Sequence, residues 1–250
     1  MTPASNFHAL VTVLFVSTSF IVLKDWVKKK LPTELGEKQS EEVASSCVSG
    51  AQAFLVTCLS LCFLVSGSEI FVELAITTAG TTFAFELLTT TLRKDMVVLH
   101  LISIVLGIVL LAQAPNINYP LYGKMALIEI SSLFLNMKYI LKIFMNSKLS
   151  CSLKDSETKF LAGVFRVLSN GDMVIERIHF SVRFLFILSF SLFRLCLLPY
   201  LLLKNRCIFF GMPFTGILFL LFVILNLTWG YFMFKKEFFS TGGSKKDELP

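Results

Sequence analysis

Charged residues are scarce in this chain. They make up only 16% of its 250 residues, whereas soluble domains usually carry about 25%. Hydrophobic residues account for 55% of the sequence, 26 of them Phe, and the mean hydropathy is +0.74. A water-soluble fold of this length has too little interior to hide so much apolar surface. The composition therefore excludes a soluble globular protein and predicts a multi-pass membrane protein.

Metal-binding and disulfide patterns are also missing. The six Cys show neither a Cys-x-x-Cys element nor another metal-ligand spacing. Because Cys58, Cys62 and Cys196 lie in apolar runs, we expect them to pack as small hydrophobic side chains. We therefore expect no metal site and no disulfide framework.

Basic residues outnumber acidic ones, with 23 Lys and Arg against 17 Asp and Glu, which gives a net charge of +6. The Lys and Arg residues cluster in short segments between apolar runs, as the residues that determine membrane topology do. This distribution argues against a nucleic-acid partner.

Seven apolar runs predict seven membrane-spanning helices. They are Phe7–Leu23, Val43–Val65, Ile70–Leu92, Met96–Gln113, Leu121–Met145, Val174–Leu203 and Ile208–Phe234. Lys residues follow the first run rather than precede it, so we expect a retained anchor instead of a cleaved signal peptide. We divide the chain into an anchor and cytosolic loop (1–42), a transmembrane domain (43–236) and a cytosolic polar tail (237–250).

The connections between the runs differ in charge. Loops one, three and five and the tail hold most of the Lys and Arg, whereas loops two and four hold none. The positive-inside rule then predicts a luminal or external N-terminus and a cytosolic C-terminus. Trp229 and Tyr231, near the end of the last run, are expected to anchor it at the membrane interface.

Several ionisable and polar residues lie inside the apolar runs. A charge at the bilayer centre costs about 2.5–3.5 kcal/mol on insertion scales, so such residues usually face a protein interior or a cavity. The residues expected to line the polar part of a cavity are Glu86, His100, Glu129, Asn136 and Arg183.

These residues also have structural interpretations. Glu129 with Arg183 or Arg194 would form buried ion pairs that fix the helix register. Arg183 and Arg194 are spaced to share one face of an α-helix. His100 would simply form a hydrogen bond to a neighbouring helix.

Three stretches of the sequence carry short motifs of polar and aromatic residues. Residues 77–111 hold an Asp before a His, residues 126–141 hold Glu-x-Ser-x-x-Phe-x-Asn, and residues 225–236 hold an Asn and a Trp. The residues concerned are Asp95, His100, Glu129, Ser131, Phe134, Asn136, Asn226 and Trp229. In order and spacing they resemble the TLC-domain family, which includes translocating-chain-associating membrane proteins, ceramide synthases and the ceroid-lipofuscinosis neuronal protein 8.

The resemblance is closest to the branches of this family that are not ceramide synthases. It implies an all-α membrane protein in which six of the seven helices form a TLC-type bundle around an elongated lipid cavity. The function it implies is lipid homeostasis, in which the protein binds, senses or moves a sphingolipid or phospholipid and adjusts membrane lipid composition. The endoplasmic reticulum is the location that it favours, with the Golgi and the plasma membrane as alternatives.

A second interpretation is an N-acyltransferase resembling ceramide synthase. Its catalytic residues would be His100, as the base that takes a proton from the attacking amine, and Asp95. Acyl-CoA would be its cosubstrate, and no cofactor is expected otherwise. Ceramide synthases look like they carry an adjacent His pair, whereas Leu101 follows His100 here, which disfavours catalysis.

A third interpretation is a cargo receptor or translocation partner in the endoplasmic reticulum, whose cytosolic loops contact the trafficking machinery. Homo- or hetero-oligomers are compatible with each of these functions. A seven-helix receptor is disfavoured, because the sequence lacks the expected Asp-Arg-Tyr and Asn-Pro-x-x-Tyr elements.

Overall fold

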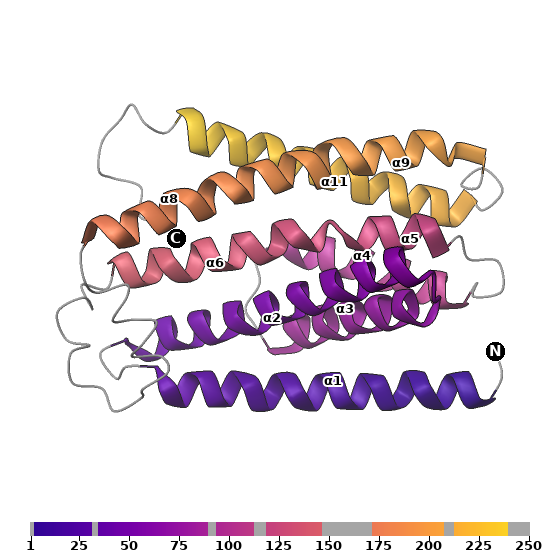
Figure 1. Ribbon diagram of the computed structural model, residues 1–250, viewed down its shortest axis with the longest axis horizontal. Coiled ribbons are helices and arrows are strands. Elements are labelled where there is room, and N and C mark those ends of the chain that lie inside the picture. Colours follow the sequence, from indigo (N-terminus) through magenta and orange to yellow (C-terminus); the bar gives the residue numbers. More distant parts are fainter. Residues whose placement is uncertain are drawn as a thin grey trace.

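The computed structural model describes residues 3–31, 35–89, 94–112, 119–146, 172–207 and 213–239. Within these ranges the chain is helical and contains no β-strand. The helices are α1 (Pro3–Lys30), α2 (Glu37–Ser66), α3 (Ile70–Thr89), α4 (Lys94–Ala112), α5 (Tyr119–Ala126), α6 (Glu129–Asn146), α8 (Asp172–Ser189), η4 (Phe190–Leu197), α9 (Leu198–Lys204) and α11 (Pro213–Phe239). They lie along the long axis of an elongated bundle (Figure 1). The all-helical fold class is confirmed.

Four of the described helices are long and apolar enough to cross a membrane. They cover Glu37–Ser66 in α2, Ile70–Leu88 in α3, Arg177–Lys204 in the continuous rod α8–η4–α9, and Pro213–Lys235 in α11. Helix α4 contributes a shorter apolar stretch, His100–Val109. These helices support an integral membrane protein, while seven spans and a six-helix TLC bundle stay predictions.

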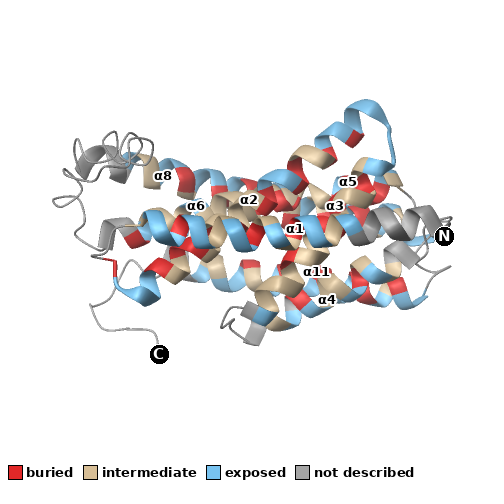
Figure 2. Cartoon of the chain, turned by 90° about the horizontal axis from the view of Figure 1, so that it is seen from below, coloured by how far each residue is buried: buried red, intermediate tan, exposed pale blue. Residues whose placement is uncertain are grey.

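The outer surface of the bundle is apolar. Val65, Leu88 and Phe15 are 90%, 86% and 72% exposed, and Figure 2 shows exposed positions along α1 on the near side. In water, apolar surface on this scale would mark an interaction site or an aggregation liability. Hydrocarbon solvates such side chains at no cost, so this surface fits a lipid environment.

The helical state follows from the same environment. Lipid offers no partners to backbone N–H and C=O groups, so an apolar run satisfies them within a helix. Hydroxyl groups follow this rule, since Thr57, Ser60 and Thr82 each donate to the carbonyl four residues earlier, at 2.8, 2.8 and 2.9 Å. Helix α2 ends where Gly67 takes a φ of 71° and its N–H bonds to the Phe63 carbonyl at 2.7 Å. A glycine adopts this left-handed conformation without strain.

Helix α1 packs against α2 and α3. Val16 and Phe20 of α1 are buried against Val48 of α2. At the C-terminal end of α1, the Lys24 and Lys28 ammonium groups lie 2.5 and 3.1 Å from the Glu41 carboxylate. The hydrogen bond to Glu41 and its negative charge raise the pKa of Lys28 above the usual value.

The fifth predicted span, Leu121–Met145, is divided in the structure. Helix α5 ends at Ala126 and α6 begins at Glu129. Between them the amide of Ile128 bonds to the carbonyl of Met125 at 3.1 Å, an i→i+3 contact that tightens the chain locally. The prediction of one continuous helix is therefore wrong, and the break places Glu129 in the first turn of a new helix.

The main core cluster lies between α2, α3, α4, α5, α9 and α11. Its fully or nearly buried side chains include Phe63, Val72, Leu198 and Phe219. Gly123 of α5 lets this core close, because a Cβ added there would lie 2.4 Å from the Phe63 ring.

We therefore expect Gly123→Ala to destabilise the bundle by about 1–3 kcal/mol, the usual cost of overpacking. The measurement is the melting temperature of the purified protein in detergent. Gly80→Ala in α3 is the matched control, because a Cβ there meets no atom within 4 Å and Ala favours a helix over Gly by about 1 kcal/mol. Equal melting temperatures for the two variants would contradict this packing of α5 on α2.

Candidate functional site: a cavity between the helices

A cavity of about 150 Å³ lies where α3, α4, α5, α6, η4 and α11 meet. Its polar or charged lining residues are His100, Ser103, Tyr122, Glu129, Ser132, Arg194 and Trp229. The apolar lining includes Phe83, Leu106, Met125, Ile128 and Phe222.

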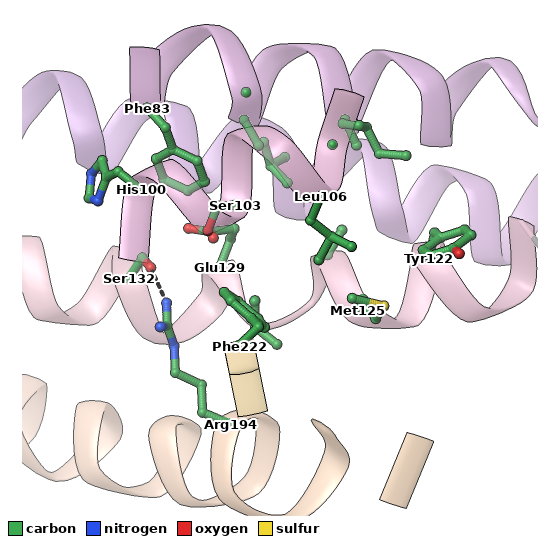
Figure 3. A pocket seen from close by; sticks show the side chains of 18 of the residues that line it. Phe83, His100, Ser103, Leu106, Tyr122, Met125, Glu129, Ser132, Arg194 and Phe222 are labelled. Carbon is green, nitrogen blue, oxygen red and sulfur yellow. Dashed lines mark hydrogen bonds between the residues drawn. The ribbon is translucent and has the colours of Figure 1, made fainter. Parts of the chain in front are cut away.

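The lining changes in character along the cavity. In Figure 3, His100, Ser132 and Arg194 lie toward one end, whereas Leu106 and Met125 lie toward the other. An amphipathic molecule with a polar head and an apolar body matches such a lining.

The volume of the cavity bears on what can enter. Small-molecule pockets usually measure about 300–1,000 Å³, so 150 Å³ is small by comparison. The space bounded by the described residues therefore suits a headgroup or the end of a chain. A complete fatty acyl chain needs more room, so the elongated lipid cavity stays a prediction.

Arg194 is the most highly connected polar residue of the site. Its side chain is buried, with the residue 6% exposed. Nε donates to Ser131 Oγ at 2.7 Å and Nη2 donates to Ser132 Oγ at 2.7 Å (Figure 3), while Nη1 donates to Asn226 Oδ1 at 2.8 Å. The guanidinium carbon also lies 5.7 Å from the centre of the Phe190 ring. One side chain of η4 thus joins α6 and α11.

The π-helical winding of η4 bears on the orientation of Arg194. Hydrogen bonds of the i→i+5 type turn side chains away from the directions that an α-helix gives, and such turns are frequent at functional sites. The α-helical spacing of Arg183 and Arg194 therefore does not apply across η4. Arg183 is only half-buried and does not line the cavity.

Glu129 lies across the cavity from these contacts. The residue is 6% exposed, and its side chain points toward Ser103 of α4 (Figure 3). Among the described residues, none forms a hydrogen bond or a close ion pair with its carboxylate. Its charge does interact with that of Arg194. The predicted ion pair is thus a longer-range attraction, since the close contacts of Arg194 go to neutral oxygens.

His100 belongs to a second polar chain. Its Nε2 lies 2.6 Å from Glu86 Oε2, and the hydroxyl of Ser49 donates to the other oxygen of Glu86. The Phe83 ring packs edge-on against the imidazole at 4.8 Å. The His100 side chain is buried and lines the cavity, whereas Glu86 stands behind it and does not. A carboxylate in this position fixes the imidazole orientation.

Two other predicted site residues, Asn136 and Asp95, lie outside the cavity lining or outside the described side chains. Asn136 donates to the Ser132 carbonyl at 2.9 Å and faces Gly50 of α2. Asp95 belongs to α4, but its side chain falls outside the described part of the chain. Trp229 lines the cavity and packs on Phe190, with ring centres 5.6 Å apart, and its role as an interface anchor stays a prediction. Tyr231 is 63% exposed.

Sequence reasoning missed three serines. Ser49, Ser103 and Ser132 contribute to the polar chain or to the lining. Serine is common in membrane helices, where it satisfies its own hydroxyl on the backbone, so composition alone does not distinguish these three. Only Ser49 had a signal in the sequence, because the helix that contains it, α2, is rich in small residues.

No protein-family model, no curated protein and no solved structure matches this chain.

The Arg194 network gives a stability prediction. Arg194→Lys keeps the charge but replaces the planar fork with a compact ammonium, which cannot reach three separated oxygens in the same geometry. Each lost hydrogen bond to a charged group costs about 1.5–3 kcal/mol. We expect Arg194→Lys to lower the melting temperature clearly. Arg206→Lys, at an exposed position, should change the free energy of unfolding by no more than about 0.5 kcal/mol and leave the melting temperature almost unchanged. Equal effects would contradict the network.

Proposed function

We propose that this chain is a multi-pass membrane protein of lipid homeostasis that binds, senses or moves a sphingolipid or phospholipid. The observation that carries the proposal is the cavity, which has charged groups and apolar side chains in one lining, inside a bundle with an apolar exterior. A membrane lipid has both characters in one molecule and reaches the protein without leaving the bilayer.

The resemblance to the TLC-domain family is part of this proposal. Four residues of its motifs come from two separate stretches of the sequence, Glu129 and Ser131 from the first and Asn226 and Trp229 from the second. In the structure, Ser131 and Asn226 both bind Arg194, while Glu129 and Trp229 line the cavity beside it. Their convergence supports a shared site. The endoplasmic reticulum and a cytosolic C-terminus complete the proposal.

Filling the cavity should displace the lipid. Leu106→Trp adds bulk to a buried lining residue of α4, whereas Leu101→Trp adds it at a 49% exposed position of the same helix. We expect the first variant to lose most of the co-purifying lipid and the second to keep it, as measured by lipidomic mass spectrometry. Melting temperatures separate displacement from unfolding, because overpacking alone costs about 1–3 kcal/mol. A folded Leu106→Trp protein with its full lipid content would refute the proposal.

An N-acyltransferase is the second candidate, and the contact between His100 and Glu86 favours it. A buried imidazole oriented by a carboxylate and facing a cavity has the geometry of a general base. It would take the proton of an amine as the amine nitrogen attacks an acyl-CoA carbonyl, with the thiolate leaving.

Incubation of the purified protein with a sphingoid base and an acyl-CoA tests this candidate. An enzyme should form amide, and His100→Ala should abolish the product. Glu86→Gln should lower the rate of amide formation by less than His100→Ala does. The upper limit of its effect is the roughly 10²–10⁴-fold that general-base catalysis contributes. No amide from the folded wild-type protein would rule this candidate out.

A further inference from the structure

We propose that the polar end of the cavity binds a phosphoethanolamine headgroup, with the ammonium at Glu129 and the phosphate at Arg194. This inference rests on the proposed function and names the chemical class of its lipid. It follows from the hydrogen-bonding capacity that the two charged residues leave unused.

The Glu129 carboxylate needs a donor. The residue is only 6% exposed and lines the cavity. Its side chain has no hydrogen bond to any residue that the structure describes. An ionised carboxylate accepts several hydrogen bonds, and leaving them unmade in a buried site is unfavourable. A primary ammonium group brings three N–H donors together with the opposite charge.

Arg194 lines the same cavity, across from Glu129, and can donate to a further acceptor. A guanidinium carries five N–H donors, and the three contacts to Ser131, Asn226 and Ser132 use one donor on each nitrogen. One N–H therefore remains on each terminal nitrogen. N–H donors on a cationic group suit the oxygens of a phosphate. His100, the other ionisable residue of this end, already has a carboxylate partner, Glu86, at 2.6 Å.

The two charges also select among phospholipids. They have opposite signs and line one cavity, so a zwitterionic headgroup leaves neither charge uncompensated. A quaternary ammonium has no N–H to donate, so choline would leave the Glu129 oxygens unbonded. Glycerol headgroups lack the positive charge, and serine adds a carboxylate that Glu129 repels.

The dimensions agree with this assignment. The cavity of about 150 Å³ suits a headgroup of a few heavy atoms and not a whole lipid. Leu106, Met125 and Phe222 line the apolar remainder, where the first carbons of the tails would lie. The tails themselves would remain in the bilayer.

Binding to a methylation series tests the proposal. The purified full-length protein in detergent is stripped of lipid and incubated with phospholipids that have identical tails and ethanolamine, N-methyl, N,N-dimethyl or choline headgroups, and with the phosphoglycerol lipid. Native mass spectrometry gives the dissociation constants. We expect affinity to fall along the series, by about tenfold from ethanolamine to choline, which corresponds to about 1.4 kcal/mol.

Glu129→Gln should reduce this preference to about one, because the counter-charge is gone. Glu73→Gln is the matched control, since Glu73 accepts a hydrogen bond from Tyr119 at 3.0 Å and does not line the cavity. The control should keep the wild-type preference. If Glu129→Gln does not fold, the methylation series on the wild-type protein decides alone.

The outcomes separate this inference from the proposed function. Equal binding of the ethanolamine and choline lipids, or tighter binding of the phosphoglycerol lipid, overturns the headgroup assignment and leaves lipid binding intact. No binding of any lipid overturns both. Free phosphoethanolamine that binds as tightly as the lipid overturns the membrane source of the ligand.

Discussion

The buried guanidinium of Arg194 is the constraint on which the centre of this structure depends. A cation removed from water needs acceptors at close range, and here a serine pair of α6 and the Asn226 amide supply them at 2.7–2.8 Å. Both irregular segments of the bundle adjoin this network. The π-helix η4 carries Arg194, and the break between α5 and α6 immediately precedes Glu129 and Ser131. Regular helices in both places would present these side chains in other directions.

The sequence predicted the helices well and their interruptions poorly. Long apolar runs leave the backbone no alternative to a helix in lipid, so an all-helical chain with membrane-crossing segments was readable from hydropathy. The break at Leu127–Ile128 carries neither Pro nor Gly, which are the usual signals. The π-helix at Phe190–Leu197 contains neither residue, although Pro199 lies just beyond it and lacks a backbone N–H. Because tertiary contacts stabilise both, a single sequence does not reveal them.

For the site as well, the sequence indicated which residues lie in the interior but not which residues contact one another. Ionisable residues inside apolar runs pointed to an interior, and two of the residues expected to line a cavity, His100 and Glu129, do so. Arg194 lines it as well, although it was expected only to form an ion pair. Their partners were harder to predict, because a contact between two helices leaves no pattern in either one. The 2.6 Å contact of His100 is with Glu86, on the preceding helix. Helix α3 packs against α4, and that contact between helices decides the pairing.

The size of the cavity bears on how a lipid would be handled. A protein that encloses a complete lipid must bury its tails, and transfer then requires the bundle to open widely. Under the proposed function, a cavity of about 150 Å³ would take a headgroup or the end of a chain, and most of each tail would stay in hydrocarbon and contribute little to selectivity. Discrimination would then fall to Glu129 and Arg194, since charge and hydrogen bonding distinguish headgroups while apolar contacts barely do. Such an arrangement favours reading the headgroup of a resident lipid over extracting the whole molecule.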